Sequence, residues 1–315
     1  MSLVFLLSGI GGDLAQSVAR CLRDQYPDAT LVGIDTNSEH AGSVFVDMVE
    51  RVEHAKDKDY FTSLKSILRS THPNFFFPLS DLELSELSSL TESELISLFG
   101  ETQIVWSGAR ALSLFQSKNL TMEYLCKLGL NTPRVFNMDK NQIKFPVVIK
   151  PNEGSGSKKI YICTSWDELS AASVFIENPI IQEYIPGPES EYTVGVFARL
   201  GKNVKTISFR RKLSANGRTS WCETYYDPNL DAICKKVAES IELTGSINIQ
   251  LRKNQGEYYI FEINPRFSST VLIRHKLGFR DVIWSIEETS QFEKFDPALI
   301  KYVAFAVYQS EVKLD

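Results

Sequence analysis

Short apolar runs alternate with amphipathic stretches along the first hundred residues. The apolar runs predict four buried strands, at Leu3–Leu7, Leu31–Ile34, Asn74–Pro78 and Gln103–Trp106. The stretches between them have helical periodicity and predict helices from Asp13 to about Gln25, over Tyr60–Arg69 and over Leu82–Phe99. Alternation of strands and helices is typical of an α/β domain with a parallel sheet and helices on both faces.

The second part of the chain has shorter helices and more strands. A helix pair is expected first, and two groups of strands follow it. The predicted helices are Ala109–Phe115, Lys118–Leu128, Trp166–Ile176, Pro228–Leu243 and one from about Val271. The predicted strands are Phe145–Pro151, Ile160–Cys163, Pro179–Tyr184, Glu191–Arg199, Val204–Arg210, those carrying Asn248 and Glu262, and the strand-like tail Lys301–Tyr308. Proline and glycine in Ile185–Pro188 predict a hinge between the two groups.

Polar side chains lie at alternate positions on two of these strands. Glu262 and Asn264 are two residues apart, so both point to one face, and Arg266 follows. Asn248 and Gln250 have the same spacing on the preceding strand. Carboxylate and amide oxygens beside a guanidinium suit Mg²⁺ and phosphate. A polar face on an edge hairpin is the alternative interpretation of this spacing.

A lysine precedes a glycine-rich hairpin in the middle of the chain. Lys150 ends the apolar strand Phe145–Pro151, and the loop 152–159 reads N-E-G-S-G-S-K-K. Backbone N–H groups of such a loop can surround phosphates, because glycine allows close approach. The G-x-x-x-x-G-K-[ST] pattern is absent, so this is not a Walker A loop. An ordinary mobile hairpin tip is the alternative.

The amino-acid composition limits the possible binding partners of this protein more than it limits its possible activity. The 315 residues are 43% hydrophobic and 23% charged, with a net charge of −5, so we expect no nucleic-acid partner. Five scattered cysteines without C-x-x-C spacing predict reduced thiols rather than a disulfide framework or a zinc site. No apolar run approaches the ~18 residues that span a bilayer. A cytoplasmic protein with no membrane partner is expected.

The first strand is followed by the turn Gly9-Ile10-Gly11-Gly12, and the second strand ends at Asp35. This pattern invites a dinucleotide-binding interpretation, but Ala15 occupies the third glycine position of the motif. Another small molecule at the strand ends is the preferred interpretation, since that crevice is a general ligand site in open α/β sheets.

The chain resembles the ATP-grasp superfamily in a series of features that follow one another in order. These are Lys118, Lys150 with its glycine-rich hairpin, and the segments Q-E-Y-I-P-G, N-x-Q and E-x-N-P-R. The resemblance is to its carbamoyl-phosphate-synthase-like branch and covers about Lys118–Thr270. It implies a Rossmann-like pre-ATP-grasp domain over residues 1–108, then a two-lobed ATP-grasp fold. The small lobe would comprise residues 109–185 and the large, α+β lobe residues 186–315.

The resemblance also implies roles for individual residues. Lys118 and Lys150 would bind nucleotide phosphates, and Glu191 would bind the ribose hydroxyls. The loop residues that would close over the phosphates are Ser155, Gly156 and Ser157. The segment facing adenine would be Glu183, Tyr184 and Ile185. The implied magnesium ligands are Gln250, Glu262 and Asn264, supported by Asn248. Arg266, Lys150 and Arg210 would be the catalytic cations, with Arg211, Lys212, Arg218 and Arg274 as further candidates for binding carboxylate or γ-phosphate, and His275 as a weaker one.

The implied chemistry is ligation driven by ATP and Mg²⁺, with Mn²⁺ as an alternative metal. A small-molecule carboxylate would become an acylphosphate, and an amine would displace phosphate. Three alternatives stay open: a subunit that makes an acyl- or carboxyphosphate for a partner, a non-catalytic ATP-binding module, and an NAD-linked role for the first domain. Dimers are frequent among such proteins, so a homodimer is possible, and the oligomeric state stays open. One departure is Gln250, where many relatives have an acid.

Overall fold

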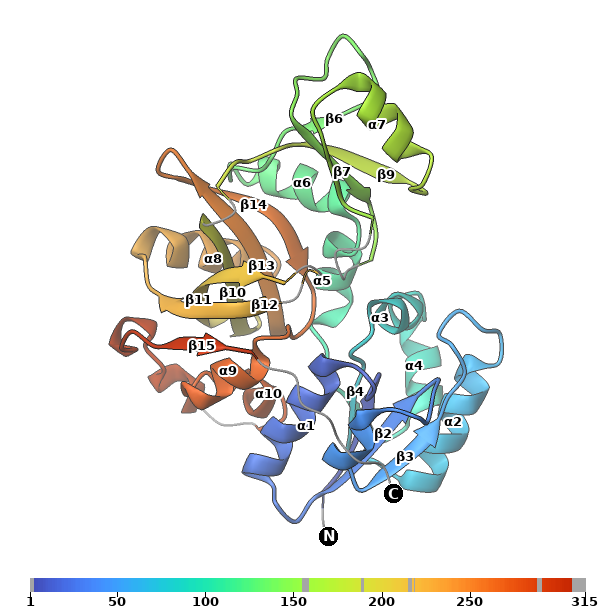
Figure 1. The fold of residues 1–315 in the computed structure, drawn as a ribbon. Coiled ribbons are helices and arrows are strands. Elements are labelled where there is room, and N and C mark those ends of the chain that lie inside the picture. The colour runs from blue at the N-terminus through green and yellow to red at the C-terminus, as the bar shows by residue number, and fades with distance from the viewer. Residues whose placement is uncertain are drawn as a thin grey trace.

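A five-stranded parallel sheet with the order β3-β2-β1-β4-β5 forms the N-terminal domain (Figure 1). The computed structural model describes residues 3–154, 159–187, 190–214, 217, 219–287 and 291–307. The strands are β1 (Val4–Ser8), β2 (Thr30–Asp35), β3 (Met48–Arg51), β4 (Phe75–Phe77) and β5 (Gln103–Ile104). The helices are α1 (Asp13–Gln25), α2 (Tyr60–Thr71), α3 (Asp81–Ser88) and α4 (Glu92–Phe99), with the 3-10 helix η1 (Ala41–Phe45). The predicted α/β architecture is confirmed.

The predicted helix Leu82–Phe99 is wrong in one respect, because it is two helices. Thr91 caps α4: its hydroxyl accepts a hydrogen bond from the Glu94 N–H, and the Glu94 carboxylate accepts one from the Thr91 N–H. This reciprocal capping box satisfies donors at a new helix start, so the chain breaks after α3. The break leaves α3 as a short helix directly after β4.

A four-stranded antiparallel sheet with the order β6-β9-β7-β8 forms the small lobe. Its strands are β6 (Val135–Phe136), β7 (Val147–Pro151), β8 (Tyr161–Cys163) and β9 (Pro179–Glu183), with α7 (Trp166–Ser173) packed on one face. Two helices, α5 (Gly108–Phe115) and α6 (Lys118–Lys127), connect it to the first domain.

A six-stranded sheet with the order β14-β13-β10-β11-β12-β15 forms the large lobe. Its strands are β10 (Glu191–Arg199), β11 (Lys202–Leu213), β12 (Thr219–Tyr225), β13 (Gly245–Asn254), β14 (Glu257–Asn264) and β15 (Ala304–Ala306). The other elements are α8 (Pro228–Ser240), α9 (Val271–Lys276), α10 (Asp281–Trp284) and the 3-10 helices η3 (Gln291–Lys294) and η4 (Pro297–Leu299).

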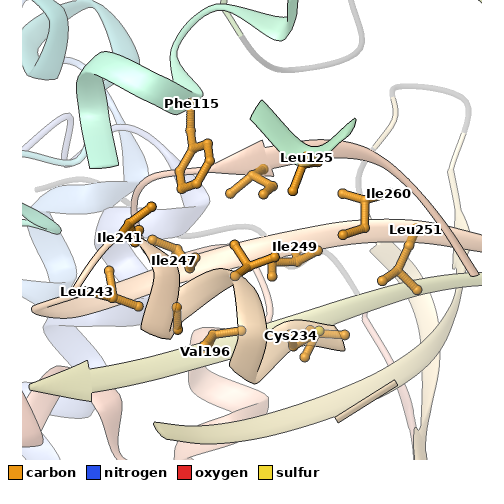
Figure 2. Packing of buried hydrophobic residues seen from close by; sticks show 14 of the residues in the cluster. Phe115, Leu125, Val196, Cys234, Ile241, Leu243, Ile247, Ile249, Leu251 and Ile260 are labelled. Atoms are coloured by element: carbon orange, nitrogen blue, oxygen red, sulfur yellow. The ribbon is translucent and has the colours of Figure 1, made fainter. Parts of the chain in front are cut away.

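One face of the large sheet is apolar and carries the main core. Ile247, Ile249 and Leu251 alternate with polar residues along β13. Together with Val196 of β10 they pack against α5, α6 and α8 (Figure 2). Complete burial of such a side chain contributes about 1.5–3 kcal/mol. The alternate positions on the same strands therefore face the opposite side, where the candidate site lies.

Gly195 on β10 allows a buried arginine to lie against the sheet. A Cβ at this position would lie 2.4 Å from Arg274 Nη1 and 2.6 Å from its Cδ. Arg274 is fully buried, and its Nη2 donates to Asp281 Oδ2 at 2.7 Å, so the side chain has no room to move aside. We expect Gly195→Ala to lower the free energy of unfolding by about 3 kcal/mol, as overpacking does in a filled core. Urea denaturation would measure this, and a change below about 1 kcal/mol would contradict it.

Within the described ranges, no helix has both the length and the apolar character needed to cross a bilayer.

Candidate functional site

The register of β13 and β14 brings the predicted metal ligands together. Gln250 is paired directly with Glu262, and Asn248 with Asn264. Paired residues of antiparallel strands point to the same face, so all four share one face. Thr193 of β10 lies opposite Gln250, and its hydroxyl donates to Asn248 Oδ1 at 2.9 Å. This face is opposite to the one that α8 covers.

Two lysines from the small-lobe side reach this face. Lys150 is the next-to-last residue of β7 and is buried. Its Nζ lies 3.3 Å from the Phe261 carbonyl oxygen and 5.4 Å from the centroid of the Phe261 ring. Burial lowers the pKa of Lys150 to about 8; the charge of Glu262 opposes this shift, and that of Lys118 adds to it. Lys118 begins α6, and its Nζ donates to the Gly154 carbonyl at 2.7 Å, at the start of the glycine-rich loop.

Glu191 forms ion pairs with two arginines, Arg211 and Arg252. Its Oε1 accepts from Arg211 Nε and Nη2 at 3.1 and 2.9 Å, and its Oε2 accepts from Arg252 Nε and Nη2 at 3.2 and 3.0 Å. Arg211 Nη2 also donates to Gln250 Oε1 at 2.7 Å, and Arg252 Nη1 to the Ile185 carbonyl at 2.9 Å. The carboxylate is buried, so it is the counter-charge that holds both guanidinium groups at this face.

Arg266 follows β14 and is held from the N-terminal domain. Its Nε and Nη2 donate to Asp81 Oδ1 and Oδ2 at 2.6 and 3.0 Å, and its Nη1 donates to the Phe267 carbonyl at 3.0 Å. Burial disfavours the charge, but the Asp81 carboxylate outweighs it and holds the pKa of Arg266 above its usual value. The charges of Glu262 and Asp13 also raise the pKa of Arg266.

The comparisons with known proteins agree with this geometry. A family model described as an ATP-grasp domain matches residues 115–270. This chain contains an ATP-grasp domain. The D-alanine–D-alanine ligase of Fusobacterium nucleatum is 26% identical over 53% of this chain and 62% of the ligase. The carbamoyl phosphate synthase large chain of Clostridium beijerinckii is 27% identical over 58% of this chain and 19% of the relative. This chain therefore covers less than two thirds of either relative.

Solved structures show the same fold over nearly the whole chain. The biotin carboxylase of Campylobacter jejuni has a TM-score of 0.72 at 13% identity, over 96% of this chain and 74% of that one. The L-amino acid ligase of Bacillus licheniformis has a TM-score of 0.72 at 12% identity, over 99% and 81%. The N-terminal domain and the two lobes thus have the arrangement found in ATP-grasp proteins.

Some of the residues predicted for the ATP-grasp site lie outside the described residues, and others contact protein groups in the structure. Ser155, Gly156, Ser157 and Arg218 lie outside the described residues. The exposed Glu183 ends β9, and its Oε2 accepts a hydrogen bond from the Arg134 N–H at 3.3 Å. The Tyr184 ring centroid lies 5.7 Å from the Arg252 guanidinium, and the Ile185 carbonyl accepts from it, so these two residues lie directly beside Arg252.

The structure places Arg210 on the other face of β11 from Arg211. Arg210 is paired with Tyr192 across the sheet, and Tyr192 belongs to the apolar face. Its guanidinium forms an ion pair with Glu223 on β12. Arg211, the next residue, points to the opposite face and reaches Glu191 and Gln250, because neighbouring strand residues alternate.

Two other candidate side chains support the fold instead. Arg274 is fully buried against Asp281, and His275 Nε2 lies 3.0 Å from Asp24 Oδ2 of α1. Arg274 holds two parts of the ATP-grasp large lobe together, and His275 attaches this lobe to the N-terminal domain. Both roles are structural. Lys212 is likewise engaged, with its Nζ 5.2 Å from the Trp221 ring centroid.

Three residues of the site were not predicted: Arg252, Phe261 and Asp81. Arg252 had a signal, because it lies two positions after Gln250 and therefore shares its face. Phe261 is opposite no residue, since a bulge interrupts the pairing after Gln250. Asp81 lies 185 positions from Arg266 and has no local signal.

The glycine-rich turn after β1 is hydrogen-bonded to Asp35, the last residue of β2. Asp35 Oδ2 accepts from the Gly11 N–H at 2.9 Å, and its Oδ1 accepts from the Asn37 N–H at 3.2 Å. Gly42 of η1 lies so near the Ile10 carbonyl that a Cβ would be 2.1 Å from its oxygen. The acid that would bind a ribose hydroxyl therefore stabilises the turn instead, and the dinucleotide interpretation receives no support.

Proposed function

We propose that this protein is an ATP- and Mg²⁺-dependent ligase. It would activate a small-molecule carboxylate as an acylphosphate, join it to an amine, and release ADP and phosphate. The observation that carries this proposal is the meeting of four cations with the oxygen ligands of β14. The charges of Glu262, Lys118 and Arg252 all act on the pKa of Lys150. Arg211 donates to Gln250, which is paired with Glu262. Phosphoryl transfer needs this kind of positioning and charge neutralisation.

The donor set fits Mg²⁺. Proteins bind this ion through one or two carboxylates together with substrate phosphates. Glu262 and Asn264 would supply a carboxylate and an amide oxygen from one strand. Gln250 would join them only after exchanging its hydrogen bond with Arg211. When bound, Mg²⁺ would neutralise phosphate charge. A solved relative by fold, the biotin carboxylase domain of Hydrogenobacter thermophilus 2-oxoglutarate carboxylase, is described in complex with MgADP.

The side chains of this chain would divide the remaining work. Lys150 and Lys118 would bind the phosphates, and Arg266 would stabilise the charge that develops on the transferred group. A substrate carboxylate oxygen would form the new bond to the γ-phosphorus, and the bond from phosphorus to the bridging oxygen of ADP would break. The amine nitrogen would then attack the acyl carbon, lose a proton, and expel phosphate with both electrons of the carbon–oxygen bond. These roles rest on the family resemblance and the charge arrangement together.

The partners would accordingly be a small carboxylate and an amine, in a homodimer within the cytoplasm. All five cysteine thiols are free, and four of them are buried, which is compatible with a reducing compartment.

The test is ADP release with Mg-ATP against pools of small carboxylates and amines. We expect release that depends on one pool and falls roughly 100-fold or more in Glu262→Gln, because the carboxylate nearest the phosphates is lost. Glu257→Gln is the matched control, since Glu257 lies on the same strand but is exposed at its other end. Undiminished release by Glu262→Gln would contradict the proposed site. ATP binding without release from any pool would favour a non-catalytic module or a subunit that awaits a partner.

A further inference from the structure

A buried carboxylate in the N-terminal domain lies two residues from the partner of Arg266. Glu83 is in the first turn of α3 and is only 3% exposed. Its Oε2 accepts a hydrogen bond from the Ser8 hydroxyl at the end of β1, and its Oε1 accepts one from the Tyr60 hydroxyl at the start of α2. Burial raises the pKa of Glu83 to about 7, and the Ser8 and Tyr60 hydroxyls together with the backbone at Leu79 and Ser80 oppose this shift. Hydroxyl groups from β1 and α2 thus converge on one side chain of α3.

These contacts fix the loop between β4 and α3. The Ser8 hydroxyl accepts from the Leu79 N–H at 2.9 Å while it donates to Glu83, so one hydroxyl of β1 joins Leu79 to Glu83. Ser80 is the N-cap of α3, and its own side chain makes no capping hydrogen bond. Glu83 stands at the third position of α3, from which a glutamate side chain can accept a hydrogen bond from the N-cap N–H.

Asp81 follows this loop directly and binds Arg266 through both carboxylate oxygens. A second contact from the N-terminal domain reaches the neighbouring residue, where the Ser107 hydroxyl donates to the Pro265 carbonyl at 2.6 Å. The segment after β14 is thereby held at two points by a domain that precedes it. The direction of the Arg266 guanidinium depends on where Asp81 is placed, because the donors of a guanidinium have a fixed planar geometry.

We propose that Glu83 is a positioning residue of the candidate active site: it fixes Leu79–Asp81 against β1, and through Asp81 it sets the orientation of Arg266. The value of that orientation for catalysis rests on the proposed function. The physical link from Glu83 to Arg266 does not, since it consists of the hydrogen bonds described above. Glutamine at position 83 would replace one acceptor with an N–H donor, so the Ser8 or Tyr60 hydroxyl would have to turn from donating to accepting, and the loop would shift.

The test follows the Arg266 Nε–H by nitrogen-15 NMR, with the resonance assigned by its loss in Arg266→Lys. In the wild-type protein this hydrogen should exchange slowly, because it donates to Asp81. We expect Glu83→Gln to speed its exchange at least tenfold and to move the resonance in the same direction as Asp81→Asn does. Glu86→Gln is the matched control, because it makes the same chemical change one turn further along α3, at a partly exposed position.

Tyr60→Phe provides a second variant that keeps the carboxylate and removes one of its donors. We expect a smaller change of the Arg266 resonance in the same direction. If the resonance is unchanged in both variants, the positioning role is overturned, even if the thermal midpoint falls; the ligase proposal would then still stand. The expected resonance changes without ADP release from any pool would support the positioning role and count against the ligase alone.

Discussion

Replacing Lys150 with methionine should make the unliganded protein more stable and should abolish its stabilisation by ATP. The folded protein holds a buried ammonium group whose pKa falls from 10.5 to about 8. Such a shift corresponds to roughly 3 kcal/mol of unfavourable free energy at neutral pH. Methionine has similar length and no charge, so it removes this cost and retains the apolar stem. It also removes a phosphate-binding cation, so ATP should no longer raise the unfolding midpoint.

The pH dependence gives this prediction a definite sign. Because the pKa is lowered in the folded state, the unfolded chain binds more protons between pH about 8 and 10.5. The contribution of Lys150 to the free energy of unfolding should therefore rise with pH through that window. The difference between wild type and Lys150→Met should be largest below pH 8 and shrink above it.

Denaturant unfolding at several pH values, with and without Mg-ATP, would measure both effects. Saturation at 100 times the dissociation constant stabilises a protein by about 2.7 kcal/mol, and this gain should be absent from the variant. Lys144→Met is the control, since Lys144 is exposed on the segment before β7. A Lys150→Met protein less stable than wild type at pH 7, or one still stabilised by ATP, would refute the prediction.

Replacing Glu191 with glutamine should destabilise the protein by about 3–5 kcal/mol. Glu191 and Arg211 have side chains that are 5% and 7% exposed, and Arg252 binds the second carboxylate oxygen. Loss of the negative charge leaves a buried guanidinium uncompensated, which is among the costliest single changes in a protein. The amide nitrogen of glutamine would in addition face a donor on one of the two arginines.

This result would separate two roles for Glu191. A residue that only binds ribose hydroxyls would change ATP affinity and leave the free energy of unfolding nearly unaltered. Urea denaturation without nucleotide measures the structural role alone. Glu242→Gln is a suitable control, because Glu242 pairs with Arg110 on the surface, where both side chains are more than half exposed. Exposed pairs of this kind contribute about 0–1 kcal/mol. A loss below 1 kcal/mol in Glu191→Gln would favour the ribose role.

Local patterns predicted most of the fold because they decide most of it. The apolar run Leu3–Leu7 became β1, and the tail Lys301–Tyr308 contributed β15 over its three central residues. The short exposed strand β3 had no such run, since its Met48 and Arg51 are exposed and only two residues lie between them. Edge strands with little burial lack the periodicity on which sequence reasoning depends.

The site was predicted where side chains lie close in sequence and was missed where they do not. Spacing placed Glu262 and Asn264 on one face, and the register with β13 brought Gln250 beside them. The choice between Arg210 and Arg211 depended on which face of β11 turned inward, and a shift of one residue reverses that answer. Only the partner strand β10 decides it, through a pairing that no local pattern contains.

The ion pair between Asp81 and Arg266 has a consequence for how such a protein can diversify. Residues 115–270, which match the ATP-grasp domain, contain Arg266 but not its partner. An exchange of the N-terminal domain between relatives would therefore leave this arginine without a counter-ion unless the new domain brought an acid to the same place. The two parts should be inherited together, and chimaeras joined near Gly108 should retain function only when both halves agree at this pair.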